Sequence, residues 1–255
     1  MRLVIATLVV ASLGLAAPSG AEVMQRNGVR VSFGGELSPQ RLPRSGTAPI
    51  AVSLSAKIAP VGKGQAPQLR RISIAINRYG RIDSTGLPVC RVSDIQPSTS
   101  AKALQACRRS LVGDGRFSAQ VLLPEQTPFP SDGKILAFNG VYEGKPAILA
   151  HVYGTTPAPT SFTMPFVIGR AGGNFGTKMT AQLPEATSEW GYVTGLDLNL
   201  KRRYRWAGKA RSYAVAGCPA PKGFRGAVFP FAKASFSFKG FTLGSAITRT
   251  CKARG

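Results

Sequence analysis

His151 is the single histidine among the 255 residues of the sequence, and Tyr153 follows it at a spacing of two. In a strand, this spacing places both side chains on the same face. A neutral histidine and a tyrosine, beside arginines that neutralise a uronate, could act as base and acid in an acidic-polysaccharide lyase. The sequence lacks the Gln-x-His motif and the arginine-rich strand that β-sandwich lyases of this kind carry. The lyase is therefore an alternative hypothesis for the function.

The strand around His151 has one all-aliphatic face, formed by Ile148, Ala150 and Val152. We expect that face to point into the core because it buries the most apolar surface. His151 and Tyr153 then lie on the outer or concave face, and the simplest interpretation of His151 is a partly exposed strand histidine.

Carboxylates offer little support for the other extracellular chemistry, glycoside hydrolysis, which needs two acids about 5 to 10 Å apart. The sequence has 11 Asp and Glu residues, and none of the predicted strands carries alternating acids. Asp114-Gly115 and Asp132-Gly133 are typical turn dipeptides. Glu185 and Glu189 fall in a predicted loop before Trp190.

A basic segment with interleaved aromatic residues is the best candidate for binding. Arginine presents forked donors to phosphate or carboxylate, and tyrosine and tryptophan can stack on sugar or base faces. In an extended chain, Arg203 and Arg205 share one face, while Arg202, Tyr204 and Trp206 share the other. A hairpin end whose two aromatic rings cap the core is the structural alternative. The candidate binding residues are Lys201, Arg202, Arg203, Tyr204, Arg205, Trp206, Lys209 and Arg211.

The charge is strongly positive and unevenly distributed. Lys and Arg number 33 and Asp and Glu 11, for a net charge of +22. After Asp197 the sequence contains 13 Lys or Arg residues and no acid. Such a field attracts polyanions, which outside a cell include wall polymers, acidic polysaccharides, lipid headgroups and free nucleic acid. Specific nucleic-acid recognition is not predicted.

Four cysteines, Cys90, Cys107, Cys218 and Cys251, form an even set that is typical of disulfides in an exported chain. Three pairings are possible. We favour Cys90–Cys107 and Cys218–Cys251 because each pair is local, and in the loop-entropy model each bond adds roughly 3–4 kcal/mol of stability. Neither a zinc site nor any other metal or cofactor is predicted, since closely spaced CxxC pairs and additional histidines are lacking.

The N-terminus indicates export. Arg2 precedes an apolar run over residues 3–17, and Ser19-Gly20-Ala21 supplies the small residues of a cleavage site. We expect residues 1–21 to be a signal peptide and the mature protein to be secreted, extracellular or wall-associated. No later segment is long enough to span a membrane as a helix.

Short segments of alternating apolar and polar residues predict an all-β fold. About a dozen strands with one buried face each favour an antiparallel β-sandwich. Glu143-Gly144-Lys145-Pro146 is predicted to be a hairpin turn, and Pro165 should lie at a sheet edge or bulge. The predicted strands cover residues 29–33, 50–58, 72–76, 117–121, 135–142, 147–153, 162–168, 177–183, 196–200, 229–239 and 241–251.

A single short helix is expected between the strands. Ser100 is a suitable N-cap, Leu104, Cys107 and Leu111 have helical spacing, and Gly113 offers a C-terminal stop. The disulfide to Cys90 would tether this helix. We expect residues 22–255 to form one domain, and a division into two lobes near residue 157 is the alternative.

Several segments around the cysteines resemble an uncharacterised family of exported proteins from high-GC Gram-positive soil bacteria. These segments are residues 87–90, 106–110, 112–115, 218–224, 229–231 and 248–251. The resemblance implies export, β structure and paired cysteines. It implies no catalytic residue, because the family has no assigned activity.

Together these features predict a non-catalytic secreted β-sandwich protein that associates electrostatically with anionic envelope or extracellular polymers. The lyase with His151 and Tyr153 and a structural spacer domain without a ligand are the alternatives. The sequence leaves the oligomeric state open.

Overall fold

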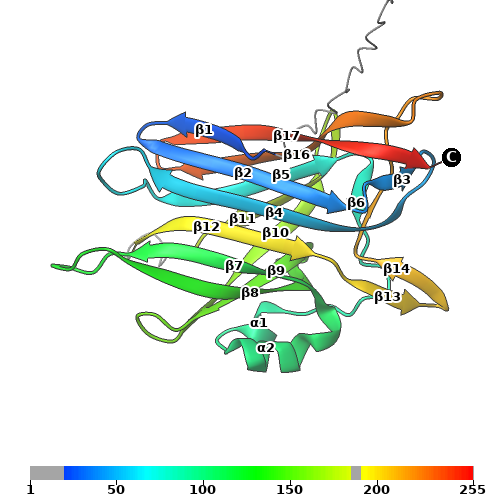
Figure 1. Cartoon of the computed structure of the whole chain (residues 1–255). Helices are drawn as coiled ribbons and strands as arrows, with labels where there is room; N and C mark the ends of the chain where they lie inside the picture. The colour runs from blue at the N-terminus through cyan, green and yellow to red at the C-terminus, as the bar shows by residue number, and fades with distance from the viewer. Residues whose placement is uncertain (1–19, 185–190, 255) are drawn as a thin grey trace, which may run out of the picture.

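The computed structural model describes residues 20–184 and 191–254, and strands make up most of it (Figure 1). The predicted signal peptide lies outside the described residues apart from its last two. Two short helices, α1 (Val92–Ile95) and α2 (Ser100–Cys107), and a 3₁₀ turn at Arg108–Ser110 complete the fold. The strands are β1 (Glu22–Arg26), β2 (Val29–Ser38), β3 (Arg41–Pro43), β4 (Ala48–Pro60), β5 (Leu69–Asn77), β6 (Gly80–Ile82), β7 (Leu111–Val121), β8 (Phe129–Tyr142), β9 (Lys145–Gly154), β10 (Thr160–Arg170), β11 (Phe175–Gln182), β12 (Gly191–Leu200), β13 (Arg203–Trp206), β14 (Lys209–Ser212), β15 (Ala214–Ala216), β16 (Gly226–Phe238) and β17 (Phe241–Arg254).

One large sheet contains 15 of these strands, in the order β1-β2-β4-β12-β7-β8-β9-β10-β11-β5-β16-β17-β3, with β15 paired to β4 and β6 paired to β15. Its pairings are antiparallel except for the short parallel contact of β3 with β17. The sheet folds back on itself, so that β2 and β16 face each other across a common core. The predicted all-β, antiparallel sandwich class is therefore confirmed.

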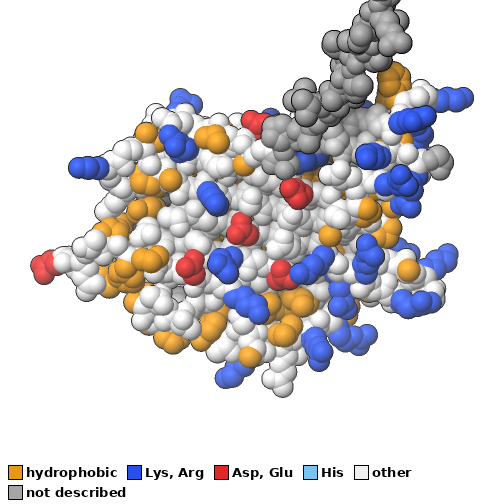
Figure 2. Space-filling model, in the orientation of Figure 1, with side chains coloured by type: hydrophobic (Ala, Val, Ile, Leu, Met, Phe, Trp, Pro, Cys, Tyr) orange, Lys and Arg blue, Asp and Glu red, His pale blue; other side chains and the backbone are white. Residues whose placement is uncertain are grey.

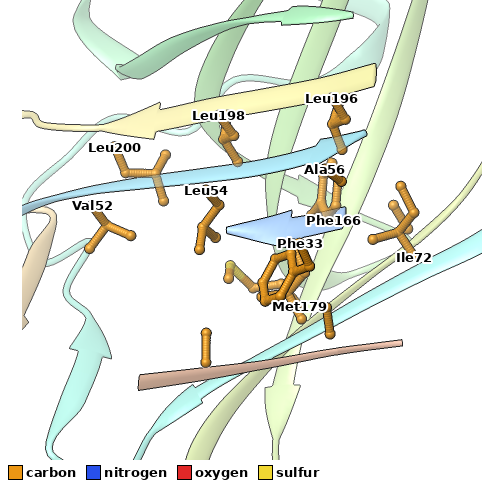
Figure 3. Close-up of a cluster of buried hydrophobic side chains, with 14 of the residues drawn as sticks. Phe33, Val52, Leu54, Ala56, Ile72, Phe166, Met179, Leu196, Leu198 and Leu200 are labelled. Carbon is orange, nitrogen blue, oxygen red and sulfur yellow. The ribbon is translucent and has the colours of Figure 1, made fainter. Parts of the chain in front are cut away.

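The core forms because successive residues of a strand point to opposite faces. In β4, Val52, Leu54 and Ala56 are buried while the residues between them are half-exposed. Figure 3 shows how these side chains converge with others from both halves of the sheet. Phe33 meets Phe236 edge to face, with ring centroids 6.1 Å apart. Each large apolar side chain buried in this way contributes about 1.5–3 kcal/mol.

Two of the predicted local features take a slightly different form. The β8–β9 hairpin turns on two residues, Glu143 and Gly144, because both have positive φ, and Lys145 already pairs with Tyr142. Pro165 pairs only with β9, since β10 joins β11 from Val167 onward. A proline is compatible with that one-sided position because it has no N–H to donate.

The helical segment is shorter than predicted. Thr99 is the N-cap of α2, where its hydroxyl accepts a hydrogen bond from the Lys102 amide at 3.3 Å, so the assignment of Ser100 as N-cap is wrong. Leu111 begins β7, and Gly113 lies within that strand. A Cβ on Gly113 would lie 1.9 Å from the Asn199 carbonyl oxygen, so the glycine permits close approach of β12 and is not a helix stop.

The two helices cover the outer face of β8 and β9, below the sheet in Figure 1. A second apolar cluster lies under them, with Leu136 and Phe138 of β8 and Leu149 of β9 packed against Cys90 and Cys107. The disulfide Cys90–Cys107 is present as predicted. It ties the end of α2 to the segment that runs along β8, where the Cys90 amide donates to Asn139 O at 2.9 Å.

The first and last long strands approach each other without joining. β17 packs against β1 and β2, yet no strand pairing links them within the described residues. The Arg249 side chain crosses this seam, and its Nε donates to Gly35 O at 2.6 Å. Residue 157, the position of the alternative two-lobe division, lies in the loop between β9 and β10, which pair along most of their length.

Candidate functional site

The basic segment forms a separate β-hairpin at one end of the sandwich. β13 and β14 pair only with each other and turn at Ala207 and Gly208, both with positive φ (Figure 1, lower right). Tyr204 lies opposite Arg211, and Trp206 lies opposite Lys209. The register places Arg203 and Arg205 on the other face, which is the alternation expected from the sequence.

One face of the hairpin packs on the loop that follows β6. The Tyr204 hydroxyl donates to Thr85 O at 2.8 Å, and Arg211 Nη1 lies 3.3 Å from a carboxylate oxygen of Asp83. Trp206 lies over Gly86, where a Cβ would come within 2.0 Å of the indole ring. The two aromatic side chains thus anchor the hairpin to this loop, and Trp206 remains 43% exposed.

Asp83 is the acidic centre of this contact. Burial pushes its pKa upward, but hydrogen bonds from the Thr85 hydroxyl and amide, together with the charges of Arg211 and Arg81, outweigh burial and leave the pKa below 3.8. The carboxylate is therefore ionised at neutral pH and neutralises Arg211. The Arg211 guanidinium also lies 5.0 Å from the centroid of the Trp206 ring, a cation–π distance.

The opposite face leaves its cations open to solvent. Arg203 and Arg205 on this face are exposed, and so is Lys209, which lies opposite Trp206 on the anchored face. None of the three forms an ion pair with a described acid. Lys201 pairs with Asp114 at 2.7 Å, and both of these side chains are exposed. Arg202 is half-buried, and its carbonyl accepts from the Tyr213 amide at 2.9 Å. The face with Arg203 and Arg205 can thus meet an anion without breaking an existing pair.

The hairpin belongs to a larger cationic end of the molecule. Figure 2 shows Lys and Arg side chains gathered where β3, β13, β14 and the end of β17 lie, whereas Asp and Glu side chains lie mostly over the middle of the sandwich. The backbone pairing of β3 with β17 places Lys252 opposite Arg41, so residues that are distant in sequence lie together at this end. In this view the cationic side chains are thus densest at this end of the protein.

The prediction that His151 lies on an outer or concave face, partly exposed, is wrong. Ile148, Ala150 and Val152 do face the main core, but His151 is fully buried on the opposite face of β9. The two helices cover that face, so it does not contact solvent. Neither ring nitrogen has a hydrogen-bond partner, and burial lowers the pKa of the imidazole below 6.5. Tyr153 is half-buried. His151 cannot reach a polysaccharide, and the lyase hypothesis loses its base.

The acids are placed differently from the prediction as well. Asp114 and Asp132 lie within β7 and β8, not in turns, since Gly115 and Gly133 allow close contacts between neighbouring strands. The other two acids considered above, at positions 185 and 189, lie outside the described residues.

The cysteines are joined as predicted, and the second disulfide, Cys218–Cys251, ties the segment before β16 to β17. Within residues 20–184 and 191–254, the one group of three potential metal ligands is Cys90, Asp94 and Cys107, and its two sulfur atoms are bonded to each other. This group therefore lacks the free thiolates that a metal site requires.

Comparisons with protein-family models, with curated proteins and with solved structures each gave no match. None of the described helices is long and apolar enough to cross a membrane.

Sequence reasoning missed an exposed apolar tip near the second disulfide. Phe224 is 64% exposed and Val228 is 71% exposed, the two largest values among the big hydrophobic residues described. The neighbouring Lys222 and Arg225 were a usable signal, because a phenylalanine between two cations in a proline- and glycine-rich segment is not typical of a buried strand.

Proposed function

We propose that the protein is a secreted, non-catalytic β-sandwich that binds anionic envelope or extracellular polymers through its cationic end. The observation that carries the proposal is the exposed face of the β13–β14 hairpin, where Arg203 and Arg205 have no acidic partner among the described residues. Arginine is suited to phosphate and carboxylate groups because its planar guanidinium can donate two parallel hydrogen bonds.

Two further features support the proposal. The hairpin is held by Tyr204, Trp206 and the Arg211–Asp83 pair, so its outer cations are presented on a fixed frame. The two disulfides are consistent with an oxidising compartment outside the cytosol. The resemblance to exported proteins of high-GC Gram-positive soil bacteria agrees with that location and remains a proposal.

The test is elution of the purified, disulfide-bonded mature chain from immobilised heparin and from immobilised teichoic acid in a salt gradient. The double variant Arg203→Ser/Arg205→Ser should elute at clearly lower salt, because exposed cations act through a field that salt screens. The matched control Arg26→Ser/Arg30→Ser removes the same charge around the β1–β2 turn, which lies at the opposite end of β2 from the cationic end, and should elute close to the unmodified protein.

An equal loss in both variants would show that net charge, and not the hairpin, drives retention. Elution of the unmodified chain no later than a neutral protein of similar size would refute the proposal and favour a spacer domain without a ligand.

A further inference from the structure

We propose that the loop before β16 docks on the surface of an anionic lipid bilayer and inserts Phe224 into its interfacial region. The proposal does not depend on polymer binding by the hairpin, because it rests on a different segment of the cationic end. The three observations behind it are an exposed apolar side chain, a rigid support for it, and a group of exposed cations without acidic partners in the same loop and the neighbouring strands.

The tip is apolar although it is open to water. Phe224 in the loop and Val228, the third residue of β16, lie four residues apart in sequence and are the most exposed of the large hydrophobic side chains described. Figure 1 shows the loop before β16, in orange, projecting beyond the body of the sandwich near the C-terminus. A large apolar side chain at the end of a projection offers surface for a partner that is itself apolar.

The loop is held in this position by several contacts. The Arg44 guanidinium donates to the carbonyl oxygens of Ala220, Pro221 and Phe224. The Phe224 amide donates to Pro221 O at 3.1 Å, which closes a tight turn. The disulfide from Cys218 fixes the start of the segment to β17. The loop is therefore already ordered, so little conformational entropy remains to be lost on binding.

Exposed cations lie in the same loop and in the neighbouring strands. Lys222 and Arg225 flank Phe224 in sequence, and the Ala253 amide donates to Arg225 O at 2.9 Å, which places the end of β17 beside the loop. Lys252 of β17 lies opposite Arg41 in the parallel β3–β17 strand pairing. The exposed cations of the tip are Arg41, Lys222, Arg225, Lys252 and Arg254. None of them forms an ion pair with a described acid.

An apolar anchor next to a group of basic residues matches an anionic membrane better than a polymer. Lys and Arg near such a surface contribute about 1 kcal/mol each through attraction to the headgroups. A soluble polyanion has no apolar phase for a phenylalanine, whereas the headgroup–acyl boundary does. Stable membrane attachment generally needs two signals, and the tip supplies a hydrophobic group and a basic patch together.

The experiment is flotation of the purified mature chain with large unilamellar vesicles of phosphatidylglycerol and phosphatidylcholine, compared with phosphatidylcholine alone. Binding should require the anionic lipid. Phe224→Ser should lower the partition coefficient about tenfold, the lower range for a buried aromatic side chain. The control Val89→Ser removes another exposed apolar side chain, in the segment before the first disulfide, and should have no effect. Retention of Phe224→Ser on heparin should equal that of the unmodified chain.

A second variant keeps the test independent of folding effects. Phe224→Trp preserves an aromatic side chain, and its added fluorescence should shift to shorter wavelength only with anionic vesicles. An unchanged spectrum on bound protein, or equal binding to neutral vesicles, would overturn the proposal. If Arg203→Ser/Arg205→Ser loses heparin retention but still binds vesicles, the two surfaces are separate. If that variant loses both heparin retention and vesicle binding while Phe224→Ser keeps both, insertion of Phe224 is overturned.

Discussion

The two disulfides, Cys90–Cys107 and Cys218–Cys251, lie in regions of opposite character, one covered and the other exposed to solvent. The first disulfide holds two helices over β8 and β9, where His151 is fully buried. The second holds a loop away from the body, where Phe224 and several cations contact solvent. A disulfide therefore fixes a segment without deciding whether that segment is covered or displayed; the surrounding residue types decide that.

Removal of each disulfide gives the largest expected effect and tests this contrast directly. The two bonds span 17 and 33 residues. In the loop-entropy model their loss costs about 3 and about 4 kcal/mol of stability, which urea unfolding measures. Only Cys218→Ala/Cys251→Ala should also weaken vesicle binding. Equal loss of binding in Cys90→Ala/Cys107→Ala would show that the two regions are not functionally separate.

The contact between the hairpin and its supporting loop should depend on Gly86. Alanine there has to adopt φ near +79° and its Cβ would collide with the Trp206 ring, so Gly86→Ala should cost about 2 kcal/mol. Gly208→Ala meets a similar φ of +75° with nothing within 4 Å of the new Cβ, and should cost only about 1 kcal/mol. A red shift of Trp206 emission in the first variant alone would confirm the contact. Equal costs would show that Trp206 does not hold the hairpin.

The covered region should be sensitive to acid. Because burial lowers the pKa of His151, the folded state keeps the imidazole neutral while the unfolded chain takes up a proton near pH 6.5. Stability is thus complete above that pH and falls as the pH drops below it. His151→Leu removes two unpartnered ring nitrogens, should raise stability by about 1 kcal/mol at pH 8, and should raise it further at pH 5. A constant difference between pH 8 and pH 5 in urea unfolding would contradict a buried neutral histidine.

The smallest effect is expected for the exposed ion pair between Lys201 and Asp114. Lys201→Ala should change stability by less than about 0.5 kcal/mol, because water and salt screen exposed pairs. Its elution from heparin should shift less than that of the Arg203→Ser/Arg205→Ser variant, since Lys201 already has an acidic partner. A larger shift would place the polymer on the β12 side of the hairpin.

The sequence predicts the regular strands well because their alternation reports burial directly. The residues of β4 and β12 that alternate in type also alternate in exposure. The disulfide pairs follow from their local spacing. The short strands β3, β6 and β15 carry no such signal, since three residues cannot show a period and their pairing depends on distant partners.

The environment of His151 could not be read from one face alone. Leu149 and, on the paired strand, Leu136 and Phe138 make the second face of this hairpin apolar too. Strands with two apolar faces are covered on both sides, and that signal was available. For Phe224 the flanking cations Lys222 and Arg225 were the signal for exposure, and it is weaker, because a single hydrophobic residue in a loop is compatible with either burial or exposure.

The strand order also determines when the protein can fold. β5 lies between β11 and β16, and the short β3 pairs with the last residues of β17. The early strands β3 and β5 are therefore completed by β16 and β17, which are synthesised near the end of the chain, and pairings this distant in sequence form slowly. The large sheet can therefore be completed only after its last strand, β17, has been synthesised.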